Sequence, residues 1–141
     1  TPFRVGNMWV KNRVVVSPMN MYSAESGNIA GDFHLVHLGQ LAMGGAGLVF
    51  AEMTSVSEDA RITPGCPGIY TREQVAAWRR ICDFVHRNSE AKFCLQLGHA
   101  GRKASSHEPW NGGQQIPVAE GGWLAHAPSA VPIKDGEDAT D

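Results

Sequence analysis

Residues 12–23 read Asn-Arg-Val-Val-Val-Ser-Pro-Met-Asn-Met-Tyr-Ser, and this stretch decides the fold class. Val14–Val16 is a β-branched run without polar alternation, which is typical of a strand buried on both faces in a parallel sheet. Pro18 lacks the N–H that a ladder needs, so we expect the strand to end near Ser17. The backbone from Ser17 to Tyr22 then lies at the carboxyl end of the strand, where α/β folds bind ligands. An ordinary strand followed by a proline turn explains this stretch alone equally well.

Length and composition describe one globular domain. The chain has 141 residues, 43% hydrophobic residues and a net charge of −2. This charge gives no electrostatic argument for binding nucleic acid or a membrane surface, and no apolar run approaches the roughly 20 residues of a spanning helix. Cys66, Cys82 and Cys94 are odd in number and lack metal-ligand spacing. We interpret them as free thiols and expect a cytoplasmic protein.

A hairpin and a first helix flank the Val14–Val16 strand. Gly6–Asn7 separates two short apolar segments, so residues 1–11 are expected to form a tight hairpin with strands at Phe3–Val5 and Met8–Val10. Asp32 is a suitable N-cap for a helix that ends at Gly44–Gly45. This helix is expected to carry Phe33, Val36, His37, Leu41 and Met43.

Two further strands and a second helix follow. Residues 47–52 form an apolar run of strand length, and Lys92–Leu97 forms another, closed by Gly98. Between them, Thr71-Arg72-Glu73-Gln74 matches a capping box. Apolar residues at helical spacing come next, namely Val75, Trp78, Ile81, Cys82 and Val85.

The alternation of strands and helices over residues 12–97 predicts consecutive βαβ crossovers and a parallel sheet. Three strands in this arrangement match the opening of a (β/α)8 barrel. Residues 98–141 are rich in Gly, Pro, Ser and His and show almost no periodicity. A segment of this length is usually functional, so we expect a long loop or lid region belonging to the same single domain.

Each predicted strand ends in polar or unusual residues. Ser17–Met19 follows the first, Glu52–Met53–Thr54 the second, and Gln96 lies at the end of the third, before Gly98. Because carboxyl ends of parallel strands meet at one edge, these residues are expected to converge. The Gln96 amide both donates and accepts, which suits the imide-like edge of a pyrimidine ring. Gly98 and Gly101 would let a flat ligand approach the backbone closely.

Four titratable residues nearby have competing structural explanations. A glutamate at a strand end often only pairs with an arginine, and Arg102 is the expected partner of Glu52. His34 and His37 are three residues apart on a helix, a spacing compatible with metal, but no third ligand is in view and packing or surface roles are favoured. We predict no metal site. For His99, a satisfied loop histidine and a functional one are equally good interpretations.

Four ordered motifs resemble the signatures of the old yellow enzyme family. They are Ser17–Pro18–Met19–x–Met21–Tyr22–Ser23, the strand from Gly47 to Thr54, Arg61–Ile62–Thr63, and Gln96–Leu97–Gly98–His99–Ala100–Gly101–Arg102–Lys103. The resemblance covers about Phe3 to Lys103. It is greatest to the bacterial branch that is also found fused to flavin hydroxylases acting on salicylyl-CoA.

The resemblance implies a (β/α)8 TIM barrel that binds FMN at its carboxyl face. Such an enzyme takes hydride from NADH or NADPH and reduces an alkene conjugated to a carbonyl, so the chain resembles an ene-reductase. Carried over by position, the FMN-binding residues are Ser17, Pro18, Met19, Asn20, Met53 and Gln96, of which Gln96 bonds the pyrimidine edge. Tyr22 would line the substrate pocket.

Two residues depart from the family pattern. Relatives often have Cys or Thr where this chain has Asn20, and a small residue where it has Met53. Both differences are expected to affect the flavin potential and the substrate range.

Several parts of the family's site are expected beyond Asp141. These are the proton donor, the groups that hold the substrate carbonyl, the arginine near flavin N1 and the phosphate site, so the catalytic residues are unassigned. We therefore expect the amino-terminal part of a barrel, inactive alone, whose partners are a small-molecule substrate and either further copies in a homo-oligomer or the missing remainder of the barrel.

Two alternatives remain open. One is a non-catalytic barrel fragment that requires its other half or self-assembly. The other is a flavin-free, phosphate-binding barrel that acts as an isomerase or aldolase, although Gln96 and the Ser-Pro-Met turn argue against it.

Overall fold

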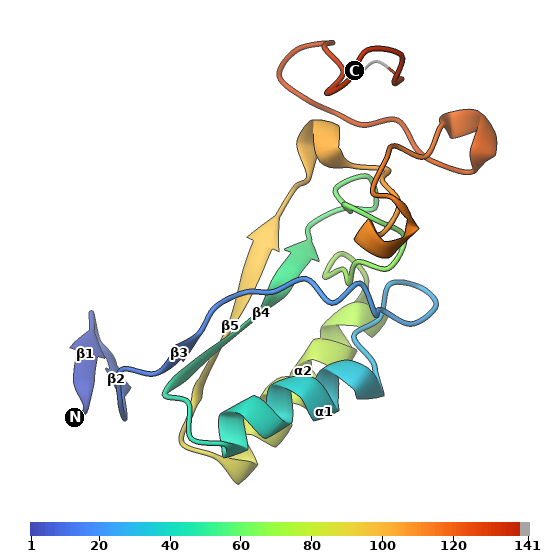
Figure 1. The fold of residues 1–141 in the computed structure, drawn as a ribbon. Coiled ribbons are helices and arrows are strands. Elements are labelled where there is room, and N and C mark those ends of the chain that lie inside the picture. Colours follow the sequence, from blue (N-terminus) through green and yellow to red (C-terminus); the bar gives the residue numbers. More distant parts are fainter. Residues whose placement is uncertain (139–141) are drawn as a thin grey trace.

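The computed structural model describes residues 1–138, and Figure 1 shows its fold. The strands and helices follow in the order β1 (Phe3–Val5), β2 (Met8–Val10), β3 (Val15–Val16), α1 (Asp32–Met43), β4 (Leu48–Ser55), α2 (Arg72–Asn88) and β5 (Lys92–Gly98). Three 3-10 turns follow, which are η1 (Gly101–Lys103), η2 (Pro109–Asn111) and η3 (Val118–Glu120).

The strands form two sheets with the predicted directions. β1 and β2 pair antiparallel in a hairpin, and β3, β4 and β5 form a parallel sheet in that order. The hairpin lies near the amino ends of the parallel strands (Figure 1). The parallel arrangement predicted for the three strands is therefore confirmed.

Both helices cover the same face of the parallel sheet (Figure 1). The core between the layers consists of apolar side chains, most of them small or medium in size, which are Ala30, Leu38, Ala42, Ala46, Val49, Ala51, Trp78, Ile81, Val85 and Ala91. The indole of Trp78 also donates a hydrogen bond to the Gly68 carbonyl at 3.0 Å. The helices therefore close one face of the sheet and leave the other available.

The two helices begin in different ways. The capping box at α2 is confirmed, since the Thr71 hydroxyl accepts from the Gln74 amide and the Gln74 side chain accepts from the Thr71 amide. The predicted N-cap of α1 is wrong by one residue, because Gly31 occupies the cap position and Asp32 is the first helical residue. Within residues 1–138, no helix is long and apolar enough to cross a membrane.

The predicted burial of the Val14–Val16 strand on both faces is also wrong. Val14 and Val15 are 59% and 46% exposed, because β3 is a short edge strand whose outer side is unpaired among the described residues. On α1, Phe33, Val36 and Met43 are exposed, and the helix buries His34, Leu38, Gly39 and Ala42. Gly39 lies so close to the Phe84 ring that a Cβ would be 2.7 Å from it, so a small residue permits the close approach of α1 to α2.

Residues 98–138 follow an irregular course beyond the carboxyl ends of the strands (Figure 1). Ser105 organises this segment from a buried position, since its hydroxyl donates to the Ile116 carbonyl at 2.8 Å and accepts from the Trp123 amide at 2.9 Å. The segment thus has a defined path without long regular elements.

The packing of α2 against the sheet predicts that substitution of Ile81 lowers stability. Ile81 is 0% exposed, so Ile81→Ala should lower the free energy of unfolding by about 2–5 kcal/mol through lost burial and a residual cavity. Val36→Ala is the control, because Val36 is 64% exposed and the change should cost less than about 0.5 kcal/mol. Urea denaturation followed by circular dichroism measures both, and equal losses would contradict this description of the core.

Candidate functional site

The predicted site residues come together at the carboxyl ends of the three parallel strands. Val16 of β3 lies opposite Val49 of β4, and Met53 of β4 lies opposite Gln96 of β5. The segment Ser17–Tyr22 leaves β3 at this end of the sheet. The convergence that the sequence predicted for these strand ends is present.

A bulge in β4 places Glu52 on the helix side of the sheet. Ala51 pairs with Leu95 and Met53 pairs with Gln96, so Glu52 is an extra residue in the ladder. It is 3% exposed, and its Oε1 accepts a hydrogen bond at 3.0 Å from Nε2 of His34, which is 1% exposed. A bulge of this kind redirects a side chain, and here it directs the carboxylate toward α1.

The second oxygen of Glu52 holds the segment after β3. Its Oε2 accepts from the Met21 backbone amide at 3.1 Å. The expectation that Glu52 pairs with Arg102 is wrong, because Arg102 instead donates to the Ser129 carbonyl and hydroxyl. A buried carboxylate needs hydrogen-bond donors, and Glu52 finds them in α1 and in the segment after β3.

Asn20 makes a second connection between this segment and β4. Its Oδ1 accepts from the Met53 amide at 3.1 Å, next to the bulge. The Asn20 side chain is therefore committed, at least in part, to positioning the backbone of β4. Together the Glu52 and Asn20 hydrogen bonds fix Ser17–Tyr22 against the sheet at two consecutive points.

Tyr22 has an unusual backbone conformation with φ of 51°. This left-handed region is costly for a bulky residue and persists only where the surroundings enforce it. The Ala24 amide donates to the Gly65 carbonyl at 3.0 Å, and a Cβ on Gly65 would lie 2.5 Å from the Tyr22 carbonyl oxygen. The Tyr22 ring contacts Trp110 edge to face, with centroids 5.8 Å apart.

Gln96 lies on the sheet face that the helices do not cover. Its neighbours Phe93 and Leu95 pack on the helix-side core, so alternation directs Gln96 to the opposite face together with its partner Met53. The Gln96 side chain is exposed and makes no hydrogen bond within residues 1–138. Gly98 accommodates Met53, since a Cβ there would lie 2.7 Å from Met53 Cγ.

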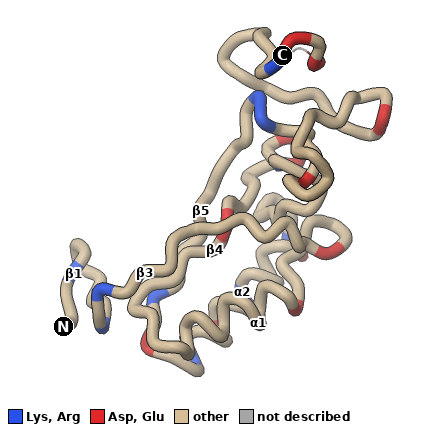
Figure 2. Tube along the Cα trace, in the orientation of Figure 1, with Lys and Arg blue, Asp and Glu red and all other residues tan. Residues whose placement is uncertain are grey.

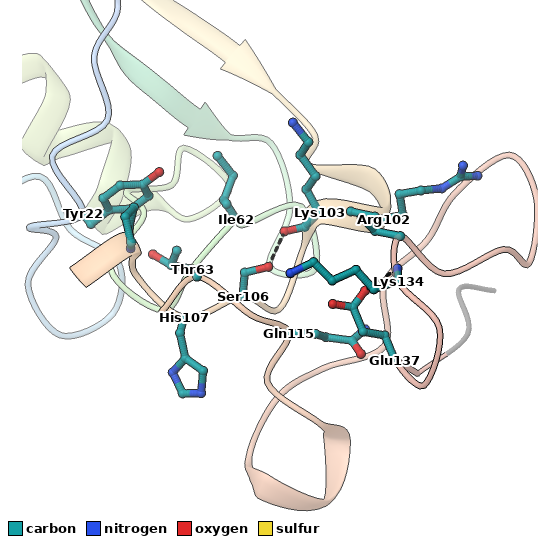
Figure 3. A pocket seen from close by; sticks show the side chains of 13 residues that line it. Tyr22, Ile62, Thr63, Arg102, Lys103, Ser106, His107, Gln115, Lys134 and Glu137 are labelled. Atoms are coloured by element: carbon teal, nitrogen blue, oxygen red, sulfur yellow. Dashed lines mark hydrogen bonds between the residues drawn. The ribbon is translucent and has the colours of Figure 1, made fainter. Parts of the chain in front are cut away.

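A pocket of about 240 Å³ lies beyond the strand ends, and Figure 3 shows it. Its lining combines the segment after β3, the loop after β4 and residues 102–137, namely Tyr22, Ile62, Thr63, Arg102, Lys103, Ser106, His107, Pro109, Gly113, Gln115, Ile133, Lys134 and Glu137. Of these residues, the sequence predicted only Tyr22 to line a pocket. The other lining residues, Lys134 among them, were not predicted, because most of them lie in residues 98–138, which have no periodicity. Trp110 does not line the pocket but contacts Tyr22, and a tryptophan between Pro109 and Gly112 was the signal available in the sequence.

His37 and His99 have structural partners. His37 stacks on Phe33, with ring centroids 5.8 Å apart. His99 Nδ1 accepts from the Gly101 amide and its Nε2 lies 3.2 Å from Asp59 Oδ2, so His99 anchors the loop after β5. A hydrogen bond from the Ser57 side chain is the main cause that lowers the pKa of Asp59. No cluster of metal-ligating side chains is present among residues 1–138.

Comparison with known proteins shows which family the chain belongs to. The sequence matches the model of the NADH:flavin oxidoreductase / NADH oxidase family over residues 1–131. The chain belongs to this family. An NADPH dehydrogenase from Bacillus cytotoxicus is 39% identical over 129 residues, which cover 84% of this chain and 37% of the relative. An NADH:flavin oxidoreductase from Gibberella zeae, FG08077, is 39% identical over 139 residues, which cover 96% and 33%.

Two solved structures share the fold. Morphinone reductase superposes with a TM-score of 0.77 at 29% identity, over 99% of this chain and 33% of its own. The old yellow enzyme from Pichia sp. AKU4542 gives 0.76 at 32% identity, over 92% and 31%. The fold is therefore that of the opening units of an old yellow enzyme TIM barrel. The chain spans about one third of the length of these relatives.

FMN is the cofactor of this oxidoreductase family, and NADH or NADPH is its hydride donor. The residues present fit a flavin ring. The exposed, unpartnered Gln96 amide offers both a donor and an acceptor, and the adaptable thioethers of Met19 and Met53 suit contact with a flat aromatic ring. The carboxyl end of a parallel sheet is also where such ligands bind.

The Glu52 hydrogen bonds predict a large effect of substitution. Glu52→Ala leaves the part-buried Met21 amide and the buried His34 Nε2 without an acceptor, so it should lower the free energy of unfolding by roughly 2–5 kcal/mol. Glu58→Ala is the matched control, because the Glu58 side chain is 82% exposed. Urea denaturation measures both. Equal stability of the Glu52→Ala and Glu58→Ala proteins would show that the buried carboxylate is dispensable.

The different burial of the cysteines predicts different rates of alkylation. All three are free thiols, as expected, and burial is the main cause that raises the pKa of Cys66. Since only the thiolate reacts and Cys66 is 0% exposed, iodoacetamide at pH 8 should label it at least about tenfold more slowly than Cys94. Mass spectrometry of a labelling time course measures the rates. Rapid labelling of Cys66 in the folded protein would be inconsistent with this packing.

Proposed function

We propose that this chain forms part of the flavin-binding site of an FMN-dependent NAD(P)H oxidoreductase, the part that contacts the flavin ring. The proposed enzyme reduces an activated alkene, an enone or enoyl-type substrate. The observation that carries the proposal is the convergence of Ser17–Tyr22, Met53 and Gln96 at one end of the parallel sheet. Its closest family branch is proposed to be the one fused to salicylyl-CoA hydroxylases, as its motifs suggest.

Each residue has a proposed role. The backbone of Ser17, Pro18, Met19 and Asn20 lies along the ring, Met53 packs beside it, and the Gln96 amide bonds the pyrimidine edge. Tyr22 lines the substrate pocket. FMN supplies hydride chemistry between NADH or NADPH and the alkene. We assign no proton donor among residues 1–138, so the proposed role of this chain is to bind, orient and shield the reactants.

The partners of the chain are also proposed. β3 and β5 each have an outer edge without a paired strand among residues 1–138, and Val14, Val15 and Leu97 are exposed beside them. Unpaired edges with exposed apolar side chains favour association. We propose that the remainder of a barrel, or a second copy of the chain, covers these edges in the active protein, and that the chain alone is inactive.

The Gln96 assignment is tested by FMN binding. In the FMN-binding protein that carries this sequence, Gln96→Ala should leave flavin polar atoms unpaired and cost about 1–3 kcal/mol. Binding should weaken by roughly tenfold to a hundredfold, measured by quenching of FMN fluorescence. Gln40→Ala, an exposed glutamine on α1, is the control and should not change affinity.

The titration also separates the alternative functions. Unchanged FMN affinity in Gln96→Ala would remove Gln96 from the site. A wild-type protein that binds no FMN in any assembly would favour a flavin-free isomerase or aldolase, and FMN binding without NAD(P)H oxidation would favour a non-catalytic barrel fragment.

A further inference from the structure

The pocket is positively charged although the chain carries a net charge of −2. Its lining includes the cations Arg102, Lys103 and Lys134 and a single carboxylate, Glu137. None of the three cations forms a salt bridge with a carboxylate in the described part of the chain, residues 1–138. Figure 2 shows the two basic segments, one after β5 and one near the carboxyl terminus, at the same end of the molecule.

A strap, defined as residues 129–138, carries Lys134 to the pocket. Arg102 holds the beginning of the strap through the Ser129 hydroxyl at 2.8 Å. Gln115 holds its end, since Gln115 Oε1 accepts from the Asp138 amide at 2.6 Å, and the Asp138 carboxylate accepts from the Val118 amide at 3.1 Å. The strap is thus attached at both ends.

Within the strap, Lys134 is the cation that reaches into the pocket. Figure 3 shows its side chain extending across the pocket toward Ser106, whereas Lys103 and Arg102 project to the sides. The Glu137 carboxylate accepts a hydrogen bond at 3.1 Å from the backbone amide of Lys134. It does not form a salt bridge with the Lys134 ammonium group in the described part of the chain. An ammonium group directed into a pocket without a carboxylate partner is suited to an anionic ligand.

The opposite side of the pocket is aromatic. Tyr22 lines it, and Trp110 contacts the Tyr22 ring edge to face. Trp110 is 67% exposed, so the aromatic side can contact a further ring or a conjugated system. The pocket therefore combines a flat apolar wall with a cationic group opposite.

We propose that Lys134, assisted by Lys103 at the rim, binds an anionic group, a phosphate or a carboxylate, on a ligand whose unsaturated part lies toward Tyr22. The identity of the ligand rests on the proposed function: the anion belongs either to the diphosphate of the nicotinamide donor or to an acidic group on the alkene substrate. The anion site itself depends only on the pocket.

Direct binding tests the site without reference to activity. Calorimetric titration of the protein with inorganic pyrophosphate, and separately with succinate, should give saturable binding of at least one probe. Lys103→Ala/Lys134→Ala should weaken that binding at least fivefold. The control is Lys11→Ala/Lys92→Ala, which removes the same charge from the hairpin end of the molecule; it should leave binding within twofold.

Binding measurements with charged and neutral ligands then distinguish the two sources of the anion. If the donor supplies it, Lys134→Ala weakens the binding of NADH but not of the neutral donor 1-benzyl-1,4-dihydronicotinamide. If the substrate supplies it, the variant weakens the binding of a carboxylated cyclohexenone but not of cyclohexenone.

Two results would overturn the anion site. They are the absence of saturable binding of both probes, and an equal loss in the Lys11→Ala/Lys92→Ala control. A protein that binds pyrophosphate or succinate through Lys134 but takes up no FMN would retain the anion site and reject the proposed function instead.

Discussion

Both oxygens of the buried Glu52 carboxylate accept hydrogen bonds, one from His34 on α1 and one from the Met21 amide after β3. Three separate parts of the chain therefore meet at one group. The bulge in β4 makes this possible, because it directs Glu52 to the helix side while the next residue, Met53, stays opposite Gln96. Without this carboxylate, the hydrogen bond that holds the Met21 backbone next to the sheet would be absent. The segment after β3, which forms one side of the proposed binding face, would then be less firmly positioned.

The two faces of the parallel sheet have different roles. The helix-side face is closed by Trp78, Ile81 and Val85 of α2 together with Leu38 and Ala42 of α1, and it supplies rigidity. The other face presents polar and thioether groups that no described residue satisfies or covers fully. Sites on rigid strands hold their groups in position better than sites on loops. In this chain the irregular residues 98–138 add the pocket wall, so its shape depends on the Ser105, His99 and Arg102 contacts.

The sequence predicted the features that depend on local patterns. The Thr71 capping box and the hairpin at Gly6–Asn7 follow from residues close together in the chain. The order of the parallel strands follows from the alternation of strands and helices, and the family resemblance identified the flavin as cofactor. The burial of α1 could not be read from periodicity, because its contact surface uses Gly39 and His34, and a partner elsewhere in the chain decides which face is buried. The Glu52 partner was wrong for the same reason: a bulge reverses the side-chain direction, and no sequence pattern marks it.

Glu52 fixes the segment after β3 against β4, and amide hydrogen exchange at Met21 tests this role most directly. NMR should show the Met21 amide exchanging at least about tenfold more slowly than the amide of Met19, because Met21 donates to a buried carboxylate. In the Glu52→Ala protein, under conditions where it remains folded, this protection should disappear at Met21 while the α2 amides around Ile81 stay protected. Rapid exchange at Met21 in the unaltered protein, or protection that survives the loss of Glu52, would contradict the claim.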